Sequence, residues 1–162
     1  MNAPQLLAPS DAGLSCEPVL LFEIGSEVFA IPADCVREIL EVPPVTRVPD
    51  AAALIDGLVN VRGAVVPLAD LRTPFEMSAD HSSEDTRIIV IEETFGVERE
   101  VIGILADKVS DVCLLDERAI EAPPGFGMRW RPEFVSGIGR KAGAFVIIPD
   151  IPAIFSFYMS DL

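Results

Sequence analysis

The sequence contains few of the residues on which catalysis most often depends. Its 162 residues include a single histidine, His81, and only three cysteines. His81 lies in the polar stretch 73–86, where no cysteine or serine stands in a recognisable nucleophile motif. A catalytic triad built on His81 would need partners that the sequence does not mark. We therefore interpret His81 as a solvated loop residue and predict that the chain has no catalytic residues.

Metal and cofactor motifs are equally scarce. The three cysteines, Cys16, Cys35 and Cys113, are too far apart to supply a close pair of ligands, and no group of His, Cys, Asp and Glu has the spacing of a metal site. The glycines of 125–127 follow two prolines and open no helix, unlike those of a phosphate-binding loop. The sequence thus predicts neither a metal nor a cofactor. Cys35 and Cys113 lie in apolar segments and are expected to be small core residues in a reducing cytosol.

Positive charge is also in short supply. Twelve Lys and Arg residues stand against 26 Asp and Glu, which gives a formal net charge of -14. Such a chain lacks the basic face that nucleic acid or an anionic membrane surface requires. The apolar runs have the length of strands, too short to span a bilayer, and no signal peptide is visible. We expect a cytoplasmic protein with no nucleic-acid partner and no direct membrane insertion.

Short apolar runs separated by glycine and proline fill most of the chain and predict a mainly all-β fold. Residues 1–17 are expected to form a mobile tail, and residues 18–162 a single domain. Asp34 is a candidate N-cap for a short helix with Val36, Ile39 and Leu40 on one face, and Asp107 for a second helical turn. The segment 153–159, which is apolar on one side, predicts a C-terminal helix. Strands are expected over 19–24, 28–31, 45–48, 87–92, 101–105, 112–115, 134–138 and 144–148, and a hairpin over 57–71.

Two patterns occur twice in the chain. The residues Gly57, Gly63-Ala64, Val66 and Asp70 are matched 80 positions later by Gly137, Gly143-Ala144, Val146 and Asp150. The segment 33–39 is matched 73 positions later by 106–112, as Ala-Asp-x-Val-x-acid-aliphatic. A repeat indicates architecture. We predict two related β-rich subdomains, roughly 30–90 and 91–148, the second also containing residues 18–29 and the C-terminal segment.

The repeat separates candidate functional residues from structural ones. Asn60 and Arg62 do not recur, since their counterparts are Arg140 and Ala142. The planar guanidinium of Arg62 suits a carboxylate, and Glu38 is a possible partner for it. An exposed pair of this kind stabilises a fold by only about 0–1 kcal/mol, which favours a recognition role.

Two further features have alternative interpretations. Val36 either packs inward with Ile39 or lies on the rim of an apolar groove. The cluster 129–131 (Arg-Trp-Arg) is the one basic and aromatic spot on an acidic chain. We interpret it as an aromatic side chain that pins a long loop to the body, and a binding role is the alternative.

The sequence resembles the CheW family of bacterial chemotaxis adaptors from about Val19 to Phe155. The resemblance rests on Gly57-x-x-Asn60-x-Arg62-Gly63-x-x-x-Pro67-x-x-Asp70-Leu71, supported by Phe29-Ala30-Ile31-Pro32, Val36-x-Glu38-Ile39 and Gly103-x-x-x-Asp107-x-Val109. It implies two SH3-like five-stranded β-barrel subdomains packed together, without catalysis. Pro149, Pro152 and the loop 123–132 depart from the family's pattern.

The resemblance also implies partners. CheW-like proteins join the regulatory domain of a CheA-type histidine kinase to the cytoplasmic tip of methyl-accepting chemoreceptors, which places them at receptor arrays on the inner face of the membrane. The positions carried over to a partner-binding role are Val36, Glu38, Gly57, Asn60, Arg62, Gly63 and Val109. Two alternatives remain open: an adaptor of another chemosensory pathway, controlling surface motility or development, and a small hydrolytic enzyme that uses His81 or the carboxylates.

Overall fold

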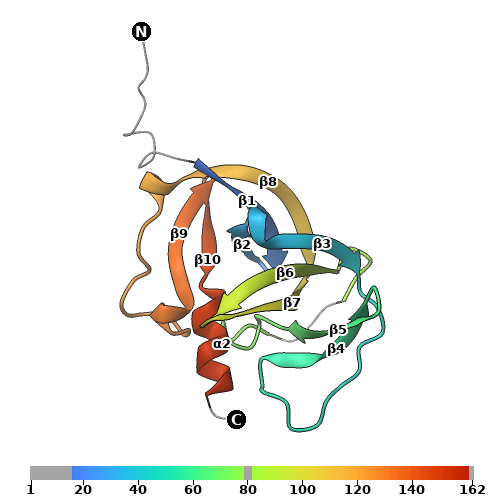
Figure 1. Cartoon of the computed structure of the whole chain (residues 1–162). Helices are drawn as coiled ribbons and strands as arrows, with labels where there is room; N and C mark the ends of the chain where they lie inside the picture. The colour runs from blue at the N-terminus through green and yellow to red at the C-terminus, as the bar shows by residue number, and fades with distance from the viewer. Residues whose placement is uncertain (1–15, 79–81, 161–162) are drawn as a thin grey trace.

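The computed structural model describes residues 16–78 and 82–160, which form two curled five-stranded sheets and one C-terminal helix (Figure 1). Sheet 1 has the order β8-β1-β2-β10-β9, and sheet 2 has the order β3-β6-β7-β5-β4. The strands of sheet 1 are β1 (Cys16–Ile24), β2 (Glu27–Pro32), β8 (Lys108–Asp116), β9 (Val135–Lys141) and β10 (Ala144–Pro149). Those of sheet 2 are β3 (Val36–Glu41), β4 (Ile55–Val61), β5 (Ala64–Ala69), β6 (Arg87–Phe95) and β7 (Glu98–Ala106). The prediction of a mainly β fold with two five-stranded units is confirmed.

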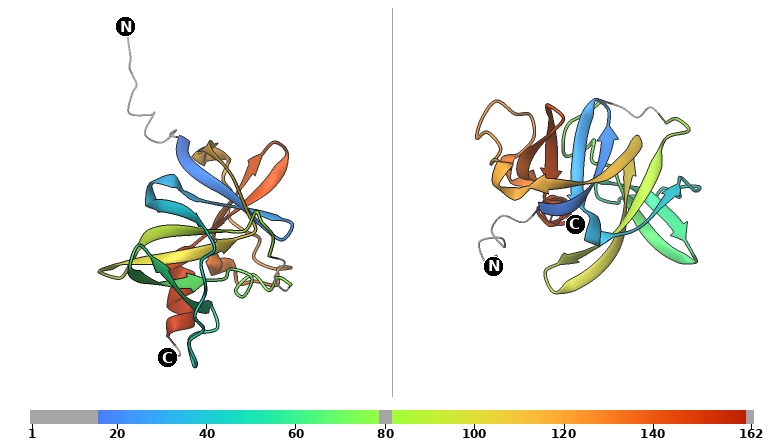
Figure 2. Two further views of the ribbon diagram at one scale, coloured as in Figure 1. Left: turned by 90° about the vertical axis from the view of Figure 1, so that its right-hand side faces the viewer. Right: turned by 90° about the horizontal axis from the view of Figure 1, so that it is seen from above.

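The two halves of the chain exchange strands. In the repeat, strands β1–β5 of the first half correspond in chain order to strands β6–β10 of the second half. Sheet 1 nevertheless combines the β1–β2 hairpin with β8, β9 and β10. Sheet 2 combines the β6–β7 hairpin with β3, β4 and β5. Seen from above, the two sheets lie side by side (Figure 2).

The sheets group residues 18–29 with strands of the second half, as in the expected division, but they divide the chain at another place than near residue 90. Residue 90 lies inside β6, and the chain passes from sheet 2 to sheet 1 at Asp107. The reason is that β7 pairs with β6 as a hairpin and with β5 in parallel, so the whole hairpin stays in sheet 2. The tail expected over 1–17 lies outside the described residues, except that β1 already begins at Cys16.

The inner strands of each sheet contain consecutive buried apolar residues because both of their faces are covered, whereas the edge strands β3, β4, β8 and β9 alternate. In β6, Ile88 and Val90 belong to a cluster formed by residues of sheet 2 alone, which fills the inside of that curled sheet. Ile89 and Ile91 belong instead to the largest cluster, which draws on both sheets and on the C-terminal helix. A smaller cluster around Leu21 fills the inside of sheet 1. This arrangement explains why the sequences of the inner strands read as continuous apolar runs rather than as alternating ones.

The repeated glycines occupy equivalent places in the hairpins β4–β5 and β9–β10. A Cβ atom on Gly57 would lie 2.6 Å from the carbonyl oxygen of Thr46, and one on Gly137 would lie 2.4 Å from Ile120 Cγ2. Each glycine thus lets an incoming segment bridge to the strand, through Thr46 to Leu58 and through Glu121 to Ile138. The segment 45–48, expected as a strand, makes only this isolated bridge. The hairpin turns match as well, with positive φ at both central residues in each: Arg62 (52°), Gly63 (86°), Ala142 (53°) and Gly143 (83°).

Replacing Ala142 by glycine should stabilise the protein. Ala142 holds a left-handed φ of 53°, which L-residues other than Gly, Asn and Asp adopt at a cost. The expected gain is up to about 1 kcal/mol, or about 2–4 °C in Tm. Ala144→Gly is the matched control, since it places glycine in β10, where it should lower stability. Thermal unfolding followed by circular dichroism measures both, and a decrease for Ala142→Gly would contradict the turn assignment.

Two short helices expected from the sequence are strands. Ala33–Cys35 forms only a single 3₁₀ turn, after which β3 pairs with β6, and residues after Asp107 form β8, which pairs with β1. Val36, Ile39 and Leu40 fit a helical spacing, but the pairing with β6 satisfies the backbone and overrides that pattern. Glu38 therefore lies on a strand and not on a helix.

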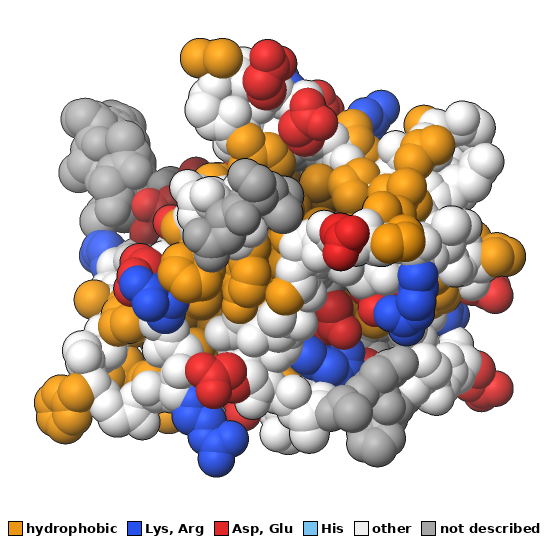
Figure 3. Space-filling model, turned by 90° about the horizontal axis from the view of Figure 1, so that it is seen from below, with side chains coloured by type: hydrophobic (Ala, Val, Ile, Leu, Met, Phe, Trp, Pro, Cys, Tyr) orange, Lys and Arg blue, Asp and Glu red, His pale blue; other side chains and the backbone are white. Residues whose placement is uncertain are grey.

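The C-terminal helix α2 (Ile151–Met159) extends downward from the end of β10 in Figure 1 and packs against β6 of sheet 2. Asp150 caps it by accepting a hydrogen bond from the Ala153 backbone N–H at 3.0 Å, and Pro152 lies in the first turn, where no hydrogen bond is lost. Ile151, Ile154 and Phe155 are buried. On the face seen from below, exposed hydrophobic side chains gather near the middle among scattered charges (Figure 3). Within the described residues, no helix has the length and apolar character needed to cross a membrane.

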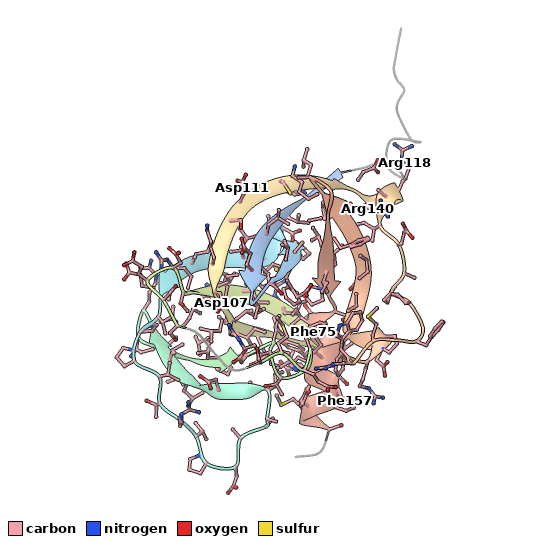
Figure 4. All side chains as sticks on the ribbon, turned by 180° about the vertical axis from the view of Figure 1, so that it is seen from behind. Phe75, Asp107, Asp111, Arg118, Arg140 and Phe157 are labelled. Atoms are coloured by element: carbon pink, nitrogen blue, oxygen red, sulfur yellow. The ribbon has the colours of Figure 1, made fainter. Side chains whose placement is uncertain are left out.

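A buried ion pair ties the two sheets together where the chain crosses between them. Asp107, labelled in Figure 4, accepts hydrogen bonds from the Gly25 backbone N–H at 2.6 Å and from the Arg72 guanidinium. Arg72 is only 6% exposed and also lies 3.5 Å from the Asp70 carboxylate. Burial raises the pKa of Asp70, while the hydrogen bond from the Arg72 backbone opposes that shift. The Asp107 carboxylate thus binds both the segment after β5, which follows sheet 2, and the β1–β2 turn, which belongs to sheet 1.

Candidate functional site

The two edge strands of sheet 2 approach each other because the sheet curls, and a salt bridge joins them there. Arg62, in the turn after β4, donates from Nε to both oxygens of Glu38 on β3, at 3.2 and 3.1 Å. The Arg62 side chain is 80% exposed and that of Glu38 is 23% exposed. The hydrogen bond and the charge of Glu38 raise the pKa of Arg62. The pairing predicted from the sequence is confirmed, and its outer side faces solvent.

The turn that carries Arg62 is held by Asn60. Its Oδ1 atom accepts a hydrogen bond from the Gly63 backbone N–H at 2.9 Å. This contact fixes the tight loop between β4 and β5 and leaves the Arg62 side chain to reach toward β3. Asn60 therefore acts on Arg62 by shaping the turn, while Gly63 supplies its second positive φ.

One exposed apolar side chain beside this pair was not indicated by the sequence pattern. Val65, which pairs with Asn60 across the hairpin, is 70% exposed. Ile39 is 42% exposed but follows Glu38 directly on β3, so its side chain lies on the opposite face of that strand. An exposed arginine beside an exposed aliphatic side chain is typical of protein-binding surfaces rather than of reactive sites. We call Glu38, Asn60, Arg62 and Val65 the Arg62 surface.

The other predicted site residues lie apart from the Arg62 surface. Val36, at the start of β3, is half-buried against the core shared by both sheets, so of the two alternatives the structure supports inward packing, but without Ile39. Val109, its counterpart in the repeat, packs against the same core from the start of β8 and pairs with Phe22. Gly57 accommodates the bridge to Thr46. No hydrogen bond or ion pair within the described ranges joins these three residues to Arg62.

Among the residues that the structure describes, the shifted titratable groups are held by burial and by single ion pairs. Burial raises the pKa of the Cys35 thiol to about 11, with repulsion from Glu93 adding to it, so this cysteine stays protonated and unreactive near neutral pH. The hydrogen bond from Arg99 lowers the pKa of Glu92, whereas burial raises that of Glu93. No group of three or more His, Cys, Asp or Glu in the described part of the chain is placed to hold a metal ion. His81 lies outside the described residues.

The loop 123–132 is pinned to the body through its aromatic residue, as predicted. The Trp130 ring meets Phe75 edge-on, with centroids 5.7 Å apart, and Phe75 in turn meets Phe29 of β2. The Arg131 guanidinium lies 4.6 Å from the centre of the Phe157 ring on α2. These contacts confirm that the aromatic residue of the Arg-Trp-Arg cluster fastens the loop to the body.

Comparisons with known proteins agree with this geometry. Residues 18–158 match the family model described as CheW-like domain. The chain is 34% identical over 137 residues to the chemotaxis protein CheW of Klebsiella aerogenes, covering 85% of this chain and 80% of that protein. It is 29% identical to the CheW of Rhizobium meliloti over 85% of this chain and 86% of the relative.

A solved structure is similar over nearly the whole length. The crystal structure of the scaffolding protein TtCheW from Thermoanaerobacter tengcongensis superposes with a TM-score of 0.77 at 27% identity, covering 87% of this chain and 88% of that chain. Two curled five-stranded sheets, a family model that spans both of them and relatives of matching length all agree. The chain belongs to the CheW-like domain family.

Proposed function

We propose that this chemotaxis scaffold couples methyl-accepting chemoreceptors to the regulatory domain of a CheA-type histidine kinase, and that the Arg62 surface is one of its docking surfaces. Coupling of this kind needs surfaces and no reactive groups. It takes place in the cytoplasm, at receptor arrays on the inner face of the membrane. Family membership supports the adaptor role, and the chemistry of the surface supports the choice of residues.

One observation carries the assignment of the surface. Arg62 is held in a defined direction by Glu38 while its side chain stays 80% exposed. An ion pair this exposed contributes little to stability. The conformation of the turn does not require an arginine either. Arg62 is the first of the two central residues and has a positive φ, and this position favours Asn, Asp or Gly. An oriented and accessible guanidinium is suited to a carboxylate on a partner.

The other predicted positions have supporting roles. Val36 is the first residue of β3 and Val109 the second residue of β8, and both contact the core between the sheets. We assign them to the receptor-facing side of the molecule, where apolar side chains between the subdomains accept a helix. Asn60, Gly63 and Gly57 shape the strand and turn that present Arg62.

Arg62→Glu should abolish capture of the kinase, by at least about 100-fold in affinity, because it places a like charge beside Glu38 and opposite the partner's carboxylate. The matched control is Arg47→Glu. Arg47 lies in the segment that bridges to β4, and its side chain is 81% exposed and paired at 3.5 Å with Asp56. Affinity capture from the native cell, read by mass spectrometry, should recover a histidine kinase and a receptor with wild type and Arg47→Glu only.

The unfolding curves complete this test. Arg62→Glu should unfold within about 1 kcal/mol of wild type, since only an exposed pair is lost. If folded Arg62→Glu still captures both partners, Arg62 is not part of the docking surface. Failure of wild type to capture either protein would refute the coupling role itself.

A further inference from the structure

An open cavity of about 760 Å³ lies on sheet 1, away from the Arg62 surface. Its floor is the face of β2, β10 and β9, where Phe29 lies beside Ile147. Its walls are the β1–β2 turn, the segment 75–78 and the loop 121–130. Phe75 and Arg140, both labelled in Figure 4, belong to two of these sides. This volume is in the range that binds small ligands or single side chains of a partner.

The floor of the cavity is apolar and partly exposed. Trp130 and Phe75 meet edge-on above Phe29, which fixes an aromatic wall. Phe145 on β10 is 64% exposed, and Met128 in the loop is 44% exposed. Such a wall suits a large apolar side chain.

Two arginines on this cavity differ from the rest of the chain. Acidic residues outnumber basic ones by 26 to 12, and most arginines lie against a carboxylate. Arg87 donates to backbone carbonyls instead. Arg129 and Arg140 are the arginines that make no ion pair or hydrogen bond with the described residues, and both line this one cavity. Arg140 only lies over the Phe145 ring, at 5.1 Å.

The carboxylates of the cavity restrict which anion can bind. Glu27 and Glu76 lie on the side of the β1–β2 turn and the segment 75–78, and Glu121 lies at the start of the loop. A polyanion would be repelled by these groups and by the net charge of -14. A ligand with one carboxylate near the arginines, an apolar body and no net negative charge avoids that repulsion.

We propose that this cavity docks a short peptide segment of a partner protein, with one large apolar side chain on the aromatic floor and one adjacent carboxylate bound by Arg129 and Arg140. Guanidinium–carboxylate hydrogen bonds are directional and give selectivity as well as affinity. A cation that follows the carboxylate in the segment would face Glu27 and Glu76. The site is independent of the Arg62 surface and of the coupling role assigned to it.

Trp130 gives a direct test because it is the single tryptophan of the chain and lines the cavity. Acetyl-Gly-Leu-Phe-Glu-Lys-Gly-amide, titrated into the full chain, should change the Trp130 emission saturably. The same peptide with Gln in place of Glu should bind about tenfold more weakly, which corresponds to about 1.4 kcal/mol. A peptide with Ser-Ser in place of Leu-Phe should produce no saturable change.

Matched variants assign the carboxylate contact. The double variant Arg129→Gln/Arg140→Gln should fold as wild type does, because both side chains are exposed. It should bind the Glu and Gln peptides equally well, because the positive charges that distinguish them are removed. Arg118→Gln, which changes an arginine already paired with Asp116, should keep the tenfold preference. Equal binding of both peptides to wild type, a preference that survives in the double variant, or no saturable change would each overturn the proposal.

Discussion

Asp107→Ala should lower the free energy of unfolding by about 3–5 kcal/mol, which corresponds to a fall of about 6–20 °C in Tm. The carboxylate accepts hydrogen bonds from the Gly25 backbone and from Arg72, a guanidinium that is only 6% exposed. Removing it leaves a buried cation without its closest counter-charge, at the point where the chain passes from sheet 2 to sheet 1. Urea unfolding followed by circular dichroism measures the loss.

The repeat provides the control for this prediction. Asp34 is the counterpart of Asp107, lies exposed, and makes no hydrogen bond or ion pair with the described part of the chain. Asp34→Ala should therefore stay within about 0.5 kcal/mol of wild type. Adding Arg72→Met to Asp107→Ala should recover part of the loss, because the unpaired charge is then gone. Equal effects of Asp34→Ala and Asp107→Ala would show that the ion pair does not fasten the sheets.

Gly57→Ala should destabilise the protein by about 1–3 kcal/mol and weaken kinase capture with it. The added methyl would lie 2.6 Å from the Thr46 carbonyl oxygen and 2.7 Å from Val45 Cγ1, so backbone must move. Thr46 and Leu58 exchange two hydrogen bonds at 2.9 and 2.7 Å, and these would lengthen. Since β4 leads directly into the turn of Arg62, its displacement shifts that side chain relative to Glu38.

A comparison of the two repeated glycines separates a backbone clash from a side-chain clash. A Cβ on Gly137 meets Ile120 Cγ2 at 2.4 Å, while the nearest backbone atom, Glu121 O, is 3.3 Å away. Ile120→Ala should therefore rescue part of Gly137→Ala, whereas Val45→Ala should not rescue Gly57→Ala. Gly125→Ala, where nothing lies within 4 Å, is the neutral control. Unfolding free energies measure all of these variants, and a full rescue of Gly57→Ala would contradict the assigned clash with Thr46.

Local patterns made much of the fold predictable. Glycine-centred turns and apolar runs located the hairpins, and the repeat of Gly57 and Gly137 identified equivalent places in the two sheets. The pairing of Arg62 with Glu38 followed from charge alone, although Glu38 was placed on a helix. The spacing of Val36, Ile39 and Leu40 does not by itself distinguish a helix from a strand. This segment is a strand because it pairs with β6, which begins 46 positions after Glu41.

The long-range features left no local signal. The repeat shows that two halves have the same order of elements, but it does not by itself say which copy each hairpin joins. The expected grouping of residues 18–29 with the second unit agrees with sheet 1, whereas the expected division near residue 90 separates β6 from β7. The register that joins Phe29 of β2 to Ile147 of β10 has no signal in either segment. Arg72 likewise looks like a surface residue beside Asp70, because its counter-charge Asp107 lies 35 positions further along. The exposure of Val65 depends on how the sheet curls.

The exchange of hairpins has a consequence for how this protein is made. During translation, β1 and β2 emerge before the other described strands, yet their sheet gains β8 only after Ala106 and gains β9 and β10 later still. Until then the apolar β1–β2 hairpin has two unpaired edges, while sheet 2 has all of its strands once Ala106 has emerged. Sheet 2 can therefore be completed before sheet 1, although the first two described strands belong to sheet 1.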